Sequence, residues 1–452
     1  MTTDAPVSLS SIMDGNSFRI ADLDRLDPAA QQLVLRRQAS LGPSYRLFYR
    51  TPVHAVSGAG AYLYDADGTR ILDAYNNVPS VGHANPAVVD AVATQMRTLN
   101  THTRYLQDGI VAYSEQLLAT LPDHIGSIMF TNSGSESNDL AIRIARLWTG
   151  GQGIVVTAEA YHGTTELLSR VSPAISGGFP DDDTVRIIPA PDAYRVDADD
   201  IGAWFAERVR EAFDDLLAHG IRPAAFLADS IFSSDGIYPD PRGFLAPAID
   251  VVHEYGALFI ADEVQPGFVR TGTTFWGFER HGVEADLVSM GKPMGNGVPV
   301  AALAGRPEIL ARFGTEVPYF NTFGGNSVSI AAAQAVLDFI QSTDLIRSVD
   351  RTGIRIRDGL LALAAGRELI GDVRGSGLYI GVDIVTDPDT KTPDSVAALG
   401  IVNALRERNV LISVAGPGNN VLKIRPPLVF GAPEADLLLE TLDAVLDEVA
   451  PR

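Results

Sequence analysis

Short apolar runs alternate with amphipathic segments along the middle of the chain. The apolar runs end in small or polar residues and are SIMFTN (127–132), GIVVTA (153–158), AAFLAD (224–229), ALFIAD (257–262), DLVSMG (286–291) and VAALAG (300–305). Between them, segments such as 86–99 and 110–121 repeat apolar residues with helical spacing. Near-continuous apolar strands that alternate with helices predict an α/β fold, in which a mostly parallel mixed sheet is covered by helices on both faces.

The two ends of the chain follow a different pattern. Residues 28–42 predict a helix, and a hairpin with its turn at Asp67-Gly68 follows. A long helix that begins near Ser327 leads into mixed helical and strand-like segments, which predict a smaller α+β domain. We therefore expect three parts, namely an N-terminal segment at 1–70 that packs with the small domain, a large domain at 71–330 and a C-terminal small domain at 331–452.

Composition and charge narrow the classes of partner. The 452 residues carry a net charge of −21 and no cysteine. The negative charge argues against nucleic acid or an anionic membrane as a partner, and the absence of cysteine excludes disulfides and thiolate metal sites. No apolar run reaches the roughly 18 residues of a membrane span, and the first residues lack the pattern of a signal peptide. We expect a cytoplasmic protein without a metal site.

The first candidate site element is a loop between a strand and a helix. Ser133, Gly134 and Ser135 follow the run 127–132, and the helix is predicted to begin near Ser135. Free backbone N–H groups at a helix N-terminus suit a phosphate group. The alternative is simple N-capping by one of the serines, with Glu136 in the first turn.

Two further candidates follow strands. Asp262 comes after a buried apolar run, so its carboxylate needs a cationic or hydrogen-bonding partner. A magnesium ion shared with Glu263 is one alternative, but neighbouring strand residues point to opposite faces. Lys292 lies just past the run 286–291, where a surface lysine with its ammonium in water is the ordinary interpretation.

Together these positions indicate one cofactor. A phosphate seat, the aromatic Tyr161 after the run 153–158, the carboxylate of Asp262 and Lys292 all lie at predicted strand ends. Pyridoxal phosphate (PLP) needs a grip on its phosphate, a ring contact, a carboxylate beside its ring nitrogen and a lysine that binds its aldehyde.

Five motifs resemble successive blocks of the class III aminotransferases of PLP fold type I, and the resemblance runs from about residue 40 to the C-terminus. The motifs are TNSGSESND, YHGTT, ADEVQPGFVRTG, SMGKPMGNGVP and NTFGGNSVS. The resemblance implies that Lys292 forms a Schiff base with PLP, that Asp262 pairs with the pyridine nitrogen and that Gln265 approaches the ring oxygen. It also implies that the cofactor phosphate is held by Ser133, Gly134 and Ser135. Tyr161 would lie over the ring, and Thr322 would reach the cofactor phosphate of a partner subunit. A homodimer, or a tetramer, with shared active sites is therefore expected.

Four other stretches are similar to the ethanolamine-phosphate and phosphohydroxylysine phospho-lyases of that class. They are LGPSYRLFY, AYNNVPSVGHANP, NTHTRYLQDGIVAYSEQL and VLKIRPPLVF. Class III aminotransferases usually have an apolar or aromatic residue at the position of Arg104 and Glu-Pro at the position of Asp229-Ser230. The phospho-lyases lack that proline but generally keep the glutamate, so Asp229 departs from both groups. The resemblance predicts β-elimination of phosphate from ethanolamine phosphate, giving acetaldehyde, ammonia and phosphate.

A phospho-lyase needs cations near its substrate phosphate. The candidates are Arg104, Lys423 and Arg425, and Asn77 is expected to line the same pocket. We expect only one of Lys423 and Arg425 to face the site, with Lys423 favoured because the family often places a carboxylate-binding arginine there. Two alternatives stay open, namely an ω-aminotransferase that acts on an ω-amino acid or diamine, and an inactive protein with the PLP fold.

Overall fold

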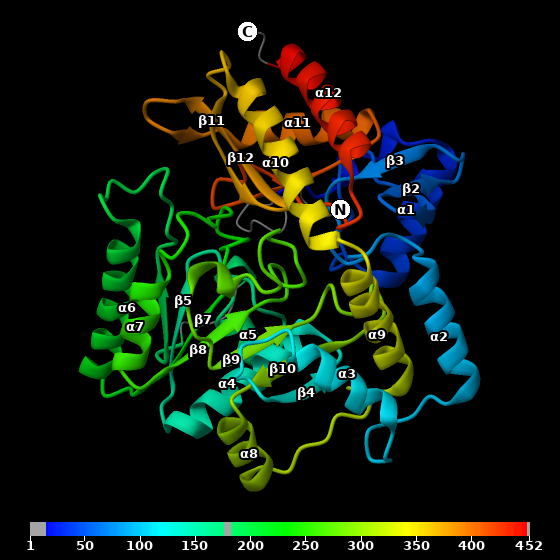
Figure 1. The fold of residues 1–452 in the computed structure, drawn as a ribbon. Helices are drawn as coiled ribbons and strands as arrows, with labels where there is room; N and C mark the ends of the chain where they lie inside the picture. The colour runs from blue at the N-terminus through cyan, green and yellow to red at the C-terminus, as the bar shows by residue number, and fades with distance from the viewer. Residues whose placement is uncertain (1–14, 176–181, 450–452) are drawn as a thin grey trace.

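The computed structural model describes residues 15–175 and 182–449, and its largest sheet has seven strands in the order β4-β10-β9-β8-β7-β5-β6 (Figure 1). Their bounds are β4 Ser127–Thr131, β5 Gly153–Thr157, β6 Val185–Ile188, β7 Pro223–Ala228, β8 Leu258–Asp262, β9 Leu287–Met290 and β10 Ala301–Gly305. Strands β9, β8, β7, β5 and β6 pair in parallel, and β10 is antiparallel to β9 and β4. The prediction of a mostly parallel mixed sheet is confirmed.

Helices cover both faces of this sheet. They are α2 Pro86–Thr98, α3 Asp108–Leu118, α4 Gly134–Thr149, α5 Glu166–Arg170, α6 Ile201–Ala218, α7 Ala246–Glu254, α8 Pro307–Glu316 and α9 Ser327–Ser342. Alternate strand residues enter two separate cores. Phe226 and Phe259 pack in the core that holds Phe205 of α6, whereas Leu227 and Ile260 pack in the core that holds Ile144 of α4. The near-continuous apolar runs of the sequence therefore reflect strands buried on both faces.

The C-terminal part forms a second sheet, at the top of Figure 1. Its antiparallel strands are β11 Ile370–Ser376, β12 Tyr379–Asp387, β16 Val421–Ile424 and β15 Ser413–Ala415, with β13 Thr392–Pro393 beside β12. The helices of this part are α10 Leu345–Ala364, α11 Ser395–Glu407 and α12 Ala432–Val449. Strands β11 and β12 form an antiparallel hairpin. It turns at Gly377, whose φ of 54° favours glycine.

Residues near the N-terminus share a sheet with the C-terminal part. Its strands are β1 Ala55–Ala59, β2 Tyr62–Asp65, β3 Arg70–Asp73 and β14 Val410–Leu411. The hairpin at Asp67-Gly68 is confirmed by the antiparallel pairing of β2 and β3, and β3 pairs in parallel with β14. Helix α1, Pro28–Leu41, precedes the hairpin. The division of the chain at residues 70 and 330 stays a proposal, and its first 14 residues lie outside the described ranges.

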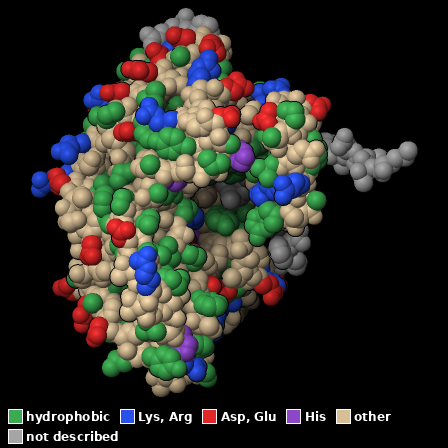
Figure 2. Space-filling view, turned by 90° about the vertical axis from the view of Figure 1, so that its right-hand side faces the viewer, with side chains coloured by type: hydrophobic (Ala, Val, Ile, Leu, Met, Phe, Trp, Pro, Cys, Tyr) green, Lys and Arg blue, Asp and Glu red, His purple; other side chains and the backbone are tan. Residues whose placement is uncertain are grey.

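The surface of the molecule is hollowed. Figure 2, which shows the face that looks to the right in Figure 1, has a hollow near its middle with hydrophobic side chains around its mouth. Within residues 15–175 and 182–449, no helix combines the length and the apolar character that a bilayer crossing requires.

Candidate active site

The carboxyl ends of β4, β5, β7, β8 and β9 meet at one edge of the large sheet, because these strands run in the same direction. A cavity of about 310 Å³ opens there. Seven of the cofactor residues expected from the sequence line it, namely Ser133, Gly134, Ser135, Tyr161, Asp262, Gln265 and Lys292. Segments far apart in the sequence are thus brought to a single site, as ligand sites in parallel sheets commonly are.

The N-terminus of α4 forms one wall of this cavity. Ser133 caps the helix, since its Oγ accepts a hydrogen bond from the Glu136 N–H at 3.2 Å. The N–H groups of Gly134 and Ser135 donate to no acceptor in the described part of the chain. A Cβ atom at Gly134 would lie 2.8 Å from Val264 Cγ2, and one at Gly163 would lie 2.6 Å from Ser135 Oγ. The loop therefore both caps the helix and leaves donors and space for an anion.

Asp262 is held from several sides at the end of β8. It is 4% exposed. Its Oδ2 accepts hydrogen bonds from Asn138 Nδ2 at 2.8 Å and His162 Nδ1 at 2.7 Å, and its Oδ1 accepts one from the Val264 N–H at 3.1 Å. These hydrogen bonds fix the orientation of the carboxylate, which would pair with a protonated ring nitrogen.

Glu263 points to the opposite side of the strand. Its carboxylate accepts hydrogen bonds from Ser230 Oγ at 2.9 Å and from the N–H groups of Gly277 at 2.7 Å and Phe278 at 2.9 Å. Asp262 and Glu263 therefore have separate sets of partners, as the alternation of side chains in a strand predicts.

Lys292 follows β9 and faces Tyr161. Its Nζ lies 5.9 Å from the centroid of the Tyr161 ring, and it forms no hydrogen bond or ion pair within the described residues. Burial, followed by the positive charge of Arg425, lowers the pKa of Lys292 to about 8, although Asp262 opposes the shift. A substantial fraction of this amine is neutral near that pH and can act as a nucleophile.

Lys423 on β16 and Arg425, one residue past the end of that strand, lie on the same side, although neither lines the cavity, so the expectation that only one of them faces the site stays a prediction. Residues two apart in a strand share a face, because the side-chain repeat is two. Lys423 Nζ lies 5.5 Å from the ring centroid of Tyr379 and the Arg425 guanidinium carbon lies 5.7 Å from it. Both positive charges act on Lys292, and neither cation pairs with a carboxylate in the described ranges. We call these two residues the cationic wall.

A hydrogen-bonded network joins the cationic wall to the cavity through Gln265. Gln265 Oε1 accepts from Tyr379 Oη at 2.9 Å and from Arg425 Nη1, and its Nε2 donates to Ser233 Oγ. The Ser233 hydroxyl donates to Asp229, which lines the cavity at the end of β7. Burial raises the pKa of Asp229, and Asp262 adds to the shift while hydrogen bonds from Ser233 and Ile231 oppose it.

Five expected site residues do not line the cavity of their own chain, namely Asn77, Arg104, Thr322, Lys423 and Arg425. Asn77 is buried beside Val78, which does line it. Arg104 and Thr322 are exposed. The guanidinium carbon of Arg104 lies 4.0 Å from the centroid of the Phe320 ring, so Arg104 packs on the loop that carries Thr322.

Sequence reasoning assigned no role to Asn138 and His162, which hold Asp262. Both lie inside motifs that carried the family resemblance, TNSGSESND and YHGTT. A polar residue one helical turn beyond a phosphate loop, and a histidine next to a ring-stacking tyrosine, were the available signals.

Comparisons with known proteins place this geometry in a family. Residues 48–446 match the model described as aminotransferase class-III. The chain is 41% identical over 435 residues to a Drosophila melanogaster protein named alanine–glyoxylate aminotransferase 2-like, covering 92% of this chain and 88% of that protein. It is 35% identical over 439 residues to ethanolamine-phosphate phospho-lyase homolog 1 of Caenorhabditis elegans, covering 93% of each.

A solved structure gives a similar result. The structure of a phospholyase from Arthrobacter in complex with phosphoethanolamine aligns with a TM-score of 0.89 and 43% identity, covering 92% of this chain and 99% of that one. The chain belongs to the class III aminotransferase family, and its fold is PLP fold type I. It is a PLP-dependent enzyme of that family.

The cavity fits PLP. The free N–H groups at the start of α4 suit its phosphate, the hydrogen-bonded carboxylate of Asp262 suits a protonated ring nitrogen, and the unpartnered amine of Lys292 suits its aldehyde. The backbone at Gly134 and Gly163 packs too closely on its neighbours for a side chain at either position.

Proposed function

We propose that this chain is a cytoplasmic PLP-dependent phospho-lyase that converts ethanolamine phosphate and water into acetaldehyde, ammonia and inorganic phosphate. The observation that carries the proposal is the cationic wall. Lys423 and Arg425 are buried, close together and without a carboxylate partner in the described ranges, in a chain of net charge −21. Burial and then Arg425 lower the pKa of Lys423 to about 7. The negative charge of a substrate phosphate would offset the repulsion between Lys423 and Arg425.

Each step of the reaction has a candidate residue. Gly134 and Ser135 would hold the cofactor phosphate, and Asp262 would hold the ring nitrogen proton. PLP supplies the electron sink that stabilises the carbanion formed at the carbon that bears the amino group. Lys292 Nζ would take the proton from that carbon, and its lowered pKa supports the role of a base near neutral pH. Lys423 and Arg425 would stabilise the phosphate that leaves when the bond between the adjacent carbon and the phosphate oxygen breaks, and hydrolysis of the remaining enamine by water would give acetaldehyde and ammonia.

Arg104 acts, in this proposal, on the site of a partner subunit. It packs against Phe320 and lies far enough from its own cavity not to line it. A hydrogen bond from Ser327 Oγ, at the start of α9, to Gln107 Oε1 at 2.7 Å also joins these two parts of the chain. If Thr322 contacts the cofactor phosphate of the partner subunit, Arg104 would lie at the same active site, because it packs on the loop that carries Thr322. Its guanidinium would then bind the substrate phosphate in that active site.

Single variants test the contribution of each cation. A charge-assisted contact to phosphate contributes about 1.5–3 kcal/mol, so Arg104→Ala and Lys423→Ala should each lower kcat/KM for phosphate release by about 10- to 150-fold. The loss of an exposed surface ion pair would lower kcat/KM by at most about fivefold. Losses within that smaller range would contradict the assignment.

Hybrid dimers test which chain supplies each cation. A mixture of Lys292→Ala and Arg104→Ala chains, unfolded and refolded together, should regain about a quarter of wild-type activity, because half the dimers carry one intact site. The matched control mixes Lys292→Ala with Lys423→Ala. It should stay inactive, because Lys423 and Lys292 serve the same site. Activity in the control mixture alone would mean that Lys423, and not Arg104, comes from the partner chain.

An ω-aminotransferase that uses an ω-amino acid or diamine and a keto acid is the second candidate. The 41% identity to the Drosophila protein favours it. Formation of alanine from pyruvate with such an amine, at a rate above phosphate release from ethanolamine phosphate, would support this candidate over the first.

A further inference from the structure

A second cavity lies between the large sheet's connecting segments and the C-terminal part. It measures about 640 Å³. Its walls come from residues 240–242, from Thr273 and Arg280, from α10 and from residues 375–377 at the β11–β12 turn. It shares no lining residue with the candidate active site.

Three arginines from three different segments meet in this cavity. They are Arg242, Arg280 and Arg357. Arg280 pairs with Asp240, and it also donates to Pro239 O at 3.0 Å and to Ser376 Oγ at 3.1 Å. Its side chain is therefore fixed in the wall.

The other two arginines have no acidic partner. Arg242 and Arg357 form no ion pair with a carboxylate of residues 15–175 and 182–449, and Arg357 donates only a long hydrogen bond, 3.5 Å, to Gly375 O. Arg374 on β11 shows the contrast, since it pairs with Asp372 at 2.8 Å and Asp383 at 3.0 Å. With a net charge of −21, acids are plentiful in this chain, so two unpaired guanidinium groups at one cavity call for an explanation.

The walls of the cavity are closely packed. A Cβ atom at Gly353 of α10 would lie 2.2 Å from Gly377 O, so the helix contacts the hairpin turn through backbone alone. Burial lowers the pKa of Arg280, and the charges of Arg242 and Arg357 lower it further while Asp240 opposes the shift. The three positive charges are thus close enough to repel one another.

We propose that this cavity is a binding site for one small phosphate-class dianion, held by Arg242 and Arg357. Two guanidinium groups can each offer a fork of N–H donors to phosphate oxygens. Asp350, which also lines the cavity, disfavours a larger polyanion by repulsion. Inorganic phosphate and a phosphate monoester share the chemistry that the site recognises. The site is separate from the proposed reaction and does not depend on it.

Equilibrium dialysis of the holoenzyme with labelled inorganic phosphate tests the proposal. Wild type should bind one equivalent per chain at this site, in addition to any phosphate at the active site. Arg357→Gln and Arg242→Gln should each weaken this equivalent by at least about tenfold, and leave the PLP absorbance and kcat/KM unchanged. Arg242 is exposed, so Arg242→Gln still tests the proposal if Arg357→Gln misfolds.

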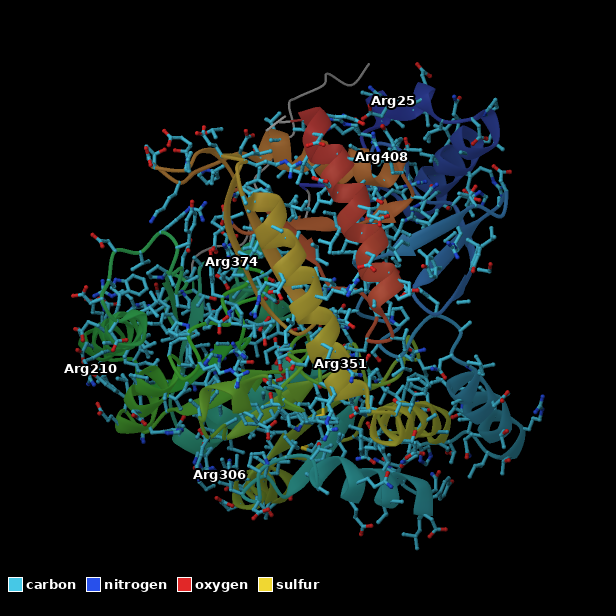
Figure 3. All side chains as sticks on the ribbon, turned by 45° about the horizontal axis from the view of Figure 1, so that its top comes forward. Arg25, Arg210, Arg306, Arg351, Arg374 and Arg408 are labelled. Carbon is cyan, nitrogen blue, oxygen red and sulfur yellow. The ribbon has the colours of Figure 1, made fainter. Side chains whose placement is uncertain are left out.

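Arg351→Gln is the matched control. Arg351 is exposed on the same helix, α10, as Figure 3 shows, and lines neither cavity. The Arg351→Gln variant should bind phosphate like wild type.

Glycerol phosphate, added as competitor, shows whether an ester or the free ion binds more tightly. Equal phosphate binding by all three glutamine variants and wild type would overturn the proposal. Loss of binding in Lys423→Ala alone would place the phosphate at the active site instead.

Discussion

At the scale of single residues, the protonation state of Lys292 connects the structure to its chemistry. The amine is buried among cations, and its strongest opposing charge is Asp262. A lysine in such surroundings loses its proton more easily than one in water. The same neighbours, Arg425 and Lys423, make the wall that we assign to the substrate phosphate, so one set of charges serves two purposes.

The pH dependence of cofactor loading follows from this. Lysine attacks an aldehyde only in its neutral form, and the neutral fraction of Lys292 grows as the pH rises through its pKa of about 8. The rate of PLP incorporation into apoenzyme should therefore rise to a plateau above that pH, as followed by absorbance. A midpoint near the ordinary lysine value of 10.5 would contradict the role of burial. Lys292→Ala, the control, should bind PLP without forming the covalent chromophore and should lose turnover.

At the scale of elements, the site depends on where strands end and where α4 begins. Five strands deliver their carboxyl ends to one edge, and α4 starts beside them at Gly134. The glycine is required by packing, since Val264 occupies the position next to its missing side chain.

Gly134→Ala should separate helix stability from cofactor binding. Alanine favours a helix over glycine, so the melting temperature should not fall much. The new methyl group meets Val264 and pushes it into the phosphate seat, so the Kd for PLP should rise by about tenfold or more, the effect of losing one charge-assisted contact. Gly109→Ala in α3 is the matched control, because a Cβ atom there meets nothing within 4 Å. Equal PLP affinity in the two variants would exclude the proposed cradle.

The sequence predicted the strands that are buried on both faces, together with the edge strand β4, and missed the half-exposed strands β1 and β6. Strands β5, β7, β8, β9 and β10 are continuous apolar runs, and each was predicted. Strand β6 reads VRII and is half-exposed, and β1 is mostly exposed, so neither shows the same apolar signal. Ser133, Asp262 and Lys292 stood out because polar residues at strand ends are visible in a sequence. Asn138 and His162 reach Asp262 only through tertiary packing, which no spacing along the chain reveals.

At the scale of the whole molecule, an apolar surface lies around Arg104. Its members are Tyr105, Leu106, Phe320 and Phe323, of which Leu106 is 98% and Phe323 69% exposed. Large exposed apolar side chains that cluster commonly mark an interface. Thr322 and Arg104 lie within this group, so a second copy of the chain that covers it would receive both residues.

Phe323→Asp tests this interface. If the chain forms the proposed dimer, a charge on the apolar surface should shift the holoenzyme from dimer to monomer in light scattering at low micromolar concentration, and PLP should bind more weakly because the proposed contact from Thr322 would be lost. Val396→Asp is the control, since Val396 is 82% exposed on α11 and lies outside this group. A fully active Phe323→Asp monomer would rule out shared active sites.

The most direct test of the central claim is the number of phosphates released per active site when no keto acid is present. Purified holoenzyme is mixed with excess ethanolamine phosphate, and inorganic phosphate, acetaldehyde and ammonia are measured over time. A phospho-lyase regenerates its cofactor at each turnover, so we predict many equivalents of all three products in equal amounts. Release of no phosphate, or a dependence of turnover on added pyruvate with alanine as the product, would contradict the account and identify an aminotransferase.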